Sequence, residues 1–141
     1  MLTKASYGIV LVSIIACGVL CSCGFVKPIL LGPRDVVVAN PSGAVSDARR
    51  LINEQANSPN RPPLFEPQEL PESLRLPGLL YAMVHGDHVD LILGHNPDLT
   101  AGARIWSPDS KRIHRDRPTK YPEIFFYQYD NDYEKTPDNL P

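Results

Sequence analysis

Two histidines and two aspartates lie close together in the sequence His85-Gly-Asp87-His88-Val-Asp90, and another histidine follows at position 95. Imidazole nitrogens and carboxylate oxygens are ligands that zinc and copper accept in proteins. We therefore consider His85, His88 and Asp90 as candidate metal ligands, with Asp87 as another possible oxygen donor. The pattern has no second histidine pair at an established metal spacing, so the sequence favours the simpler interpretation of a polar, solvated hairpin tip.

The candidate ligands surround the turn of a predicted β-hairpin. Two apolar segments, 79–85 and 88–93, flank Gly86-Asp87, and glycine in the first position of a two-residue loop suits a type II′ turn. The register that makes one face wholly apolar pairs Val84 with Val89, Ala82 with Leu91 and Leu80 with Leu93. On the other face it pairs His85 with His88, Met83 with Asp90, and Tyr81 with Ile92. Side chains opposite each other are about 5 Å apart at their β-carbons, which is close enough to share an ion.

A basic segment follows the hairpin between residues 111 and 120. Its cations are Lys111, Arg112, Arg115, Arg117 and Lys120, with Asp116 as the single acidic residue among them. Such a cluster could bind anionic lipid head groups, a phosphate-bearing envelope polymer or an acidic partner. The alternative, which we favour, is that these cations are solvated or pair with the acidic segment from Glu123 to Asp138.

The remaining chemistry in the sequence is less specific. Trp106, Phe125, Tyr127 and Tyr129, with Tyr81, could form an aromatic binding surface, but such residues more often belong to a core. The sequence contains no Gly-x-Ser-x-Gly motif and no phosphate-binding glycine loop. Net charge is −2, which does not favour nucleic acid as a partner. We expect no cofactor, and a non-enzymatic role is favoured.

The first residues predict export from the cytoplasm. Lys4 precedes 22 uncharged residues, Ala5 to Val26, and Lys27 closes the run. A positively charged start followed by an apolar stretch is typical of a secretory signal, with the positive end retained on the cytoplasmic side. About 20 apolar residues also suffice to span a bilayer, so an uncleaved signal anchor is the alternative. Cleavage by another route is a further alternative, and all three place the remainder of the chain outside the cytoplasm.

The end of this run, Leu20-Cys21-Ser22-Cys23, resembles the lipobox of bacterial lipoproteins, although Cys21 stands where Ala, Ser or Thr is more typical. The resemblance implies cleavage before Cys23 and attachment of acyl chains such as palmitate to that cysteine. Cys17 ends a second box-like segment and is the alternative attachment residue. Because Gly24 follows Cys23, in place of the aspartate that resembles an inner-membrane retention signal, a Gram-negative lipoprotein of this kind would reside in the outer membrane, facing the periplasm.

The composition predicts one domain. We expect a lipoprotein-type signal segment at 1–22, a tether at 23–34, a single α+β domain at 35–129 and a polar tail at 130–141. Segment 57–77 contains six prolines, which preclude a long helix or an interior strand. Because it also carries large apolar residues, we interpret it as an extended segment on the fold, with one helical turn at Pro71 to Arg75.

The expected fold is a small antiparallel sheet of four or five strands with one packed helix, preceded by the apolar N-terminal signal or anchor helix. The helix is predicted over Ser42 to Gln55, where apolar residues recur at spacings of three and four. Asn40-Pro41 suits its start, with Ser46 as the alternative. Besides the hairpin, strands are predicted at 35–39, 103–106 and 123–129.

The favoured function is therefore that of an accessory or interaction module in the cell envelope. We expect it to be held at a membrane through a lipid anchor and to meet an anionic envelope component or another envelope protein. The alternative is a small exported metal-binding protein or enzyme that uses His85, His88 and Asp90.

Overall fold

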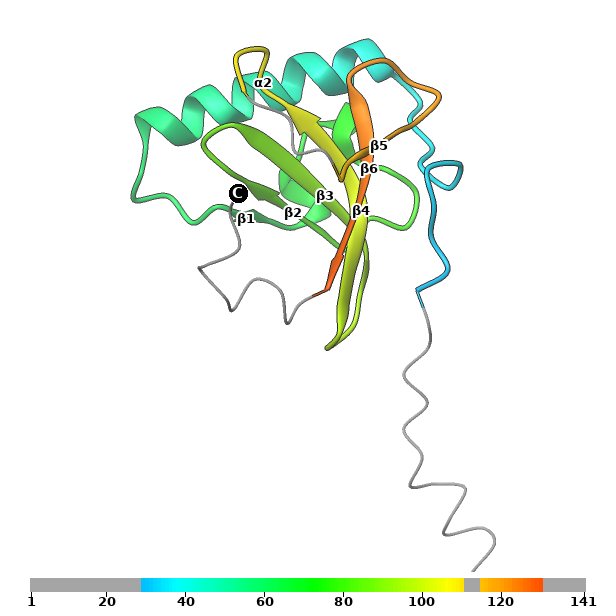
Figure 1. Cartoon of the computed structure of the whole chain (residues 1–141). Coiled ribbons are helices and arrows are strands. Elements are labelled where there is room, and N and C mark those ends of the chain that lie inside the picture. The colour runs from blue at the N-terminus through cyan, green and yellow to red at the C-terminus, as the bar shows by residue number, and fades with distance from the viewer. Residues whose placement is uncertain (1–28, 111–114, 131–141) are drawn as a thin grey trace, which may run out of the picture.

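The computed structural model describes residues 29–110 and 115–130, in which a helix packs on one face of an antiparallel sheet (Figure 1). Helix α2 spans Pro41–Asn57. The strands are β1 (Leu64–Phe65), β2 (Tyr81–Val84), β3 (His88–His95), β4 (Leu99–Trp106), β5 (Arg117–Pro118) and β6 (Ile124–Asp130). Their order in the sheet is β1-β2-β3-β4-β6-β5. The predicted α+β class is confirmed. The sheet has six strands and not the expected four or five, and it includes the edge strands β1 and β5, which have two residues each and were not predicted.

The N-terminal predictions fall outside this part of the chain. Residues 1–28 are not among those described, so the signal segment, Cys17, Cys23 and the first part of the tether stay predictions. Residues 131–141 are likewise outside, while Asp130, expected in the tail, ends β6. Within residues 29–110 and 115–130, no helix combines the length and apolar character that a membrane crossing requires.

Helix α2 begins where Asn40 and Pro41 predict it to begin. The Asn40 side-chain oxygen accepts a hydrogen bond of 3.0 Å from the Gly43 amide, and Pro41 occupies the first turn, where its missing N–H costs nothing. The alternative start at Ser46 is therefore wrong. One stripe of the helix is buried against the sheet: Ala44, Val45, Ala48, Leu51 and Ile52.

The strand predicted at 35–39 does not form. Val36 and Val38 are buried and Val37 is exposed, so the chain is extended here, but the segment joins no strand. The reason is visible at Val38, whose amide donates to the Tyr121 hydroxyl at 3.1 Å in place of a ladder carbonyl. β-Branched residues favour an extended backbone, but only a free neighbouring strand makes it part of a sheet.

The hairpin forms with the predicted register for β2 and β3. Val84 pairs with Val89 and Ala82 with Leu91. The expected Leu80–Leu93 pair is wrong, because β2 begins at Tyr81 and the Leu80 amide donates to the Ile92 carbonyl at 2.9 Å. The type II′ turn is also wrong, since that turn needs a positive φ at Gly86, and Gly78 is the only described glycine with one.

The core lies between α2 and the sheet. Alternate residues of the central strands point into it, including Val89, Leu91, Ala103 and Ile105, together with Phe126 of β6. β4 starts at Leu99, four residues before the predicted strand, and β6 starts one residue after the predicted one.

The proline-rich segment lies against this core and buries its apolar side chains there, as expected for an extended segment on the fold. Phe65, Leu70, Leu74 and Leu76 are buried. The helical turn expected at Pro71 to Arg75 is the 3-10 helix η2 (Glu72–Leu74), and a second one, η1 (Pro67–Glu69), was not predicted. Pro63 adjoins β1, which the prolines confine to the edge of the sheet.

Candidate functional site

The face of the sheet turned away from α2, which we call the distal face, holds the buried charged side chains of the described residues, Asp90 and Arg104. Its central side chains alternate along β3, β4 and β6 with those of the core. They are His88, Asp90, Ile92, Arg104, Trp106 and Tyr127. All but His88 are buried, and His88 is partly buried. Because charged groups are almost never buried without a partner, the pairing of Asp90 and Arg104 decides how this face is built.

Asp90 and Arg104 are directly opposite each other in the β3–β4 register. Arg104 Nε donates to Asp90 Oδ1 at 2.6 Å, and Arg104 Nη2 donates to Asp90 Oδ2 at 2.8 Å. Burial alone would raise the pKa of Asp90, but the hydrogen bonds and the positive charge of Arg104 outweigh it and hold that pKa well below its usual range. Asp90 is therefore an ionised carboxylate at the centre of the face.

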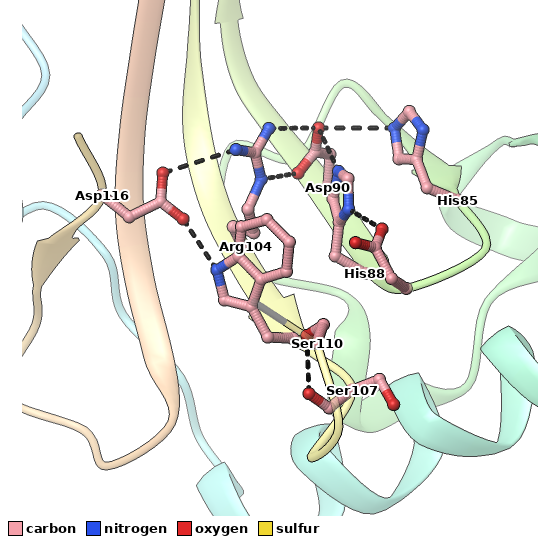
Figure 2. Close-up of polar contacts among 9 residues, drawn as sticks. His85, His88, Asp90, Arg104, Ser107, Ser110 and Asp116 are labelled. Carbon is pink, nitrogen blue, oxygen red and sulfur yellow. Dashed lines mark hydrogen bonds and ion pairs between the residues drawn. The ribbon is translucent and has the colours of Figure 1, made fainter. Parts of the chain in front are cut away.

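Asp116 closes the other side of the guanidinium. Its Oδ1 lies 3.4 Å from Arg104 Nη1 (Figure 2). Its Oδ2 accepts a 2.8 Å hydrogen bond from the indole N–H of Trp106. Burial raises the pKa of Asp116, and the positive charge of Arg104 only partly offsets this. Arg104 is thus held between two carboxylates, which fixes its position on β4.

The two histidines of the hairpin tip lie on the opposite side of Asp90 from Asp116. His85 Nε2 is 3.5 Å and His88 Nε2 is 3.6 Å from Asp90 Oδ2 (Figure 2). The two rings stack at 4.2 Å with an angle of 16° between their planes, and His88 also lies 4.6 Å from the Trp106 ring. The predicted pairing of His85 with His88 across the turn therefore brings both imidazoles to one carboxylate.

Asp87 contacts this group through His88. Its Oδ1 lies 2.6 Å from His88 Nδ1, so the carboxylate can accept the ring N–H. This arrangement makes Asp87 a support for His88 in place of the direct metal ligand considered from the sequence. His95 is not part of the group, because its Nδ1 contacts Thr100 Oγ1 at 2.8 Å at the other end of β3.

His85, His88 and Asp90 meet the simplest geometric requirement for a metal site. One ligand atom from each lies within 4.8 Å of the other two. His85 Nε2 is buried and makes no hydrogen bond within the described part of the chain. Two imidazole nitrogens and one carboxylate oxygen form a ligand set that zinc and copper accept.

The basic residues do not converge in the same way. Arg115, Arg117 and Lys120 are exposed, and Lys111 and Arg112 lie outside the described residues. The Arg117 guanidinium lies 5.0 Å from the centre of the Phe126 ring, and the Lys120 ammonium lies 5.0 Å from that of Tyr121. Anion binding by this segment stays a prediction.

The aromatic residues contribute in part to the distal face. Tyr127 is buried, its ring lies 4.4 Å from the Arg104 guanidinium and 5.6 Å from the Tyr129 ring, and its hydroxyl has no hydrogen-bond partner in the described residues. Burial raises the pKa of Tyr127. Phe125 and Tyr129 are only partly buried. Trp106 and Tyr127 are therefore buried on this face, outside the cluster packed on α2.

Arg104 and Asp116 are the residues that the sequence alone missed. Arg104 lay within a predicted strand, but its partner depends on the register between β3 and β4. Asp116 lies within the basic segment, and its position in the sequence does not indicate that it contacts Arg104 and Trp106. A search for a buried position with opposite charges on neighbouring strands could have found Asp90 with Arg104, but it could not have found Asp116.

Comparisons of the chain with protein-family models, with curated proteins and with solved structures found no match. The functional argument therefore rests on the geometry of the distal face and on the N-terminal sequence.

Proposed function

We propose that this chain is a lipid-anchored protein of the cell envelope whose domain is a binding module that acts through its distal face. The observation that carries the proposal is the gathering of charged, imidazole and aromatic side chains on that one face, around the Asp90–Arg104 pair. The opposite face of the sheet is occupied by α2 and the core.

The bonding of the charged groups supports binding over catalysis. Both oxygens of Asp90 accept hydrogen bonds from Arg104, and its low pKa makes it a weak base. Asp116 is similarly held by Arg104 and Trp106. Groups that satisfy one another in this way form a rigid buried cluster. The partly exposed side chains of Tyr81, His85 and His88 lie beside it, and such a preorganised surface suits recognition.

The N-terminal sequence supports the location. The uncharged run from Ala5 to Val26 and the lipobox-like end favour acylation at Cys23, with Cys17 as the alternative. Several acyl chains on one cysteine hold firmly, because each buried methylene contributes about 0.8 kcal/mol. The domain would then meet another envelope protein or an anionic component at the periplasmic face of an outer membrane.

The location is tested by the intact mass of the protein extracted from membranes, together with the mass of its N-terminal peptide. We expect a chain that begins at Cys23 and carries added acyl mass. Cys23→Ser should abolish the modification, and Cys17→Ser is the matched control that should leave it intact. An unmodified chain that still begins at Met1 would contradict the lipid anchor and would indicate a membrane-spanning anchor instead.

The role of the distal face is tested by a photoreactive phenylalanine analogue placed in living cells at Tyr81, which lies on this face. The control carries the same group at Asn53, which is exposed on α2. We expect one recurrent adduct from position 81 and none from position 53. Equal capture from both positions would refute the assignment of the face.

The convergence of His85, His88 and Asp90 favours a second candidate function, metal binding.

A further inference from the structure

We propose that His85, His88 and Asp90 form a binding site for one divalent transition-metal ion, zinc or copper. The proposal deepens the proposed function, on which it rests for the choice of the distal face, by naming the ligand that this face binds. Three observations carry it: the spacing of the ligand atoms, the contact between Asp87 and His88, and the charge of the surrounding cluster.

The spacing agrees with tetrahedral coordination. Bonds of about 2.1 Å from a tetrahedral ion to nitrogen and oxygen place neighbouring ligand atoms about 3.4 Å apart. The separations from Asp90 Oδ2 are 3.5 Å to His85 Nε2 and 3.6 Å to His88 Nε2. These distances are too long for good hydrogen bonds, but they suit an ion that bridges the three atoms after small side-chain rotations. Because imidazole lone pairs lie in the ring plane, the two rings, whose planes are 16° apart, must both turn for their Nε2 atoms to bind one ion.

The contact between Asp87 and His88 supports the same conclusion. Asp87 Oδ1 lies 2.6 Å from His88 Nδ1, and a carboxylate can only accept there, so the hydrogen is on Nδ1. In the neutral tautomer with its hydrogen on Nδ1, the lone pair of Nε2 is available to a metal ion, and Nε2 lies 3.6 Å from Asp90 Oδ2. A carboxylate that orients a histidine in this way is the usual second partner of a metal ligand.

The charge of the cluster suits a dication. Asp87, Asp90 and Asp116 are joined through hydrogen bonds and ion pairs to Arg104 and the histidines. The three carboxylates and the one guanidinium sum to two negative charges, which a divalent ion neutralises. Arg104 uses one lone pair of Asp90 Oδ2, and a carboxylate oxygen has a second one for the metal. Three protein ligands also leave a coordination position open for water or for a donor from a partner.

The test uses the full chain extracted in detergent, with its free thiols capped by alkylation so that cysteines do not bind the added ion. Zinc and copper(II) are added separately at micromolar concentration, and the bound metal is counted after dialysis. Trp106, the only tryptophan of the chain, lies beside His88, so bound copper(II) should quench its fluorescence. We expect one ion per chain and quenching that saturates at the same ratio.

The matched variants are His85→Gln, His88→Gln and the control His95→Gln, which lies on the same strand as His88. Loss of either ligand should weaken binding by about 100-fold or more, and Asp87→Asn by about 10- to 100-fold, the range found for residues that orient a ligand. His95→Gln should bind as the parent chain does. Circular dichroism checks that each variant is folded.

Absence of binding at micromolar metal overturns the proposal, and so does equal binding by all the variants, which would place the ion elsewhere in the chain. Either failure is distinguishable from failure of the proposed function. The acylated N-terminal peptide and the adduct at position 81 are measured without added metal, so these two results do not depend on the outcome of the metal-binding experiment.

Discussion

Asp90 on β3 and Arg104 on β4 face each other across the sheet and are joined by two hydrogen bonds, from Nε to Oδ1 at 2.6 Å and from Nη2 to Oδ2 at 2.8 Å. Both side chains are buried, so neither charge has water to compensate it. The pair fixes where the carboxylate lies relative to His85 and His88, and it therefore organises the candidate site as well as the sheet.

Removal of one charge of this pair should be strongly destabilising. We expect Arg104→Met to lower the free energy of unfolding by about 3–5 kcal/mol, because it leaves the Asp90 carboxylate buried without its counter-ion. Urea denaturation followed by circular dichroism would measure the loss.

The control for this experiment is the double variant Asp90→Leu/Arg104→Met, which removes both charges. Replacement of a buried ion pair by apolar groups is often neutral or stabilising by about 1–4 kcal/mol. The double variant should therefore be more stable than Arg104→Met alone. If both lose the same free energy, the stabilisation comes from the packing of Arg104 against Tyr127 and not from its charge.

Trp106 should report the titration of Asp116. Burial raises the pKa of Asp116 above its ordinary 3.8, so the folded chain keeps that proton to a higher pH than the unfolded chain does. Its contribution to stability is thus present at low pH and is lost as pH rises through the folded pKa. Because the Trp106 indole donates to this carboxylate, its fluorescence should change with a midpoint above pH 3.8, with unchanged circular dichroism.

Asp116→Asn is the control for this titration. An amide oxygen can still accept from the indole but does not ionise in this range, so the transition should vanish. Persistence of the same midpoint in Asp116→Asn would assign the transition to another group.

The N-terminal cap of α2 should contribute measurably to stability. Asn40→Ala removes the acceptor of the Gly43 amide and should cost about 1 kcal/mol, within the range of about 0.5–2 for such caps. Chemical denaturation measures the change. Asn53→Ala, at an exposed position inside the same helix, should stay within about 0.5 kcal/mol of wild type or be stabilising. Equal losses in the two variants would contradict the cap.

Two glycines should respond differently to alanine. A β-carbon at Gly102 would lie 2.0 Å from the Leu91 carbonyl oxygen, which belongs to the backbone and cannot yield easily. We expect Gly102→Ala to cost about 1–3 kcal/mol or more by overpacking. At Gly86 the same atom would meet nothing within 4 Å and φ is not positive, so Gly86→Ala should stay within about 0.5 kcal/mol of wild type. Thermal unfolding of both variants measures these changes in stability. A large loss of stability in Gly86→Ala would indicate a positive φ at Gly86, as a type II′ turn requires.

The structure agrees with the sequence where the determining signal is local. The start of α2 follows from Asn40 and Pro41, which act within one helical turn. The β2–β3 register follows from the alternation around Gly86-Asp87, because a slip by one residue would turn apolar side chains out of the core. That alternation alone already predicted that His85 and His88 lie opposite each other.

Other features depend on contacts between segments far apart in the chain. Segment 35–39 has the composition of a strand, but Tyr121 takes the Val38 amide. Arg104 meets Asp90 because β4 pairs with β3 in one register, and Asp116 reaches both Arg104 and Trp106 from the loop before β5. Thus the sequence by itself determined the helix start, the hairpin and two facing histidines. Only the tertiary structure decided their surroundings, because burial and pairing of charges arise when distant strands come together.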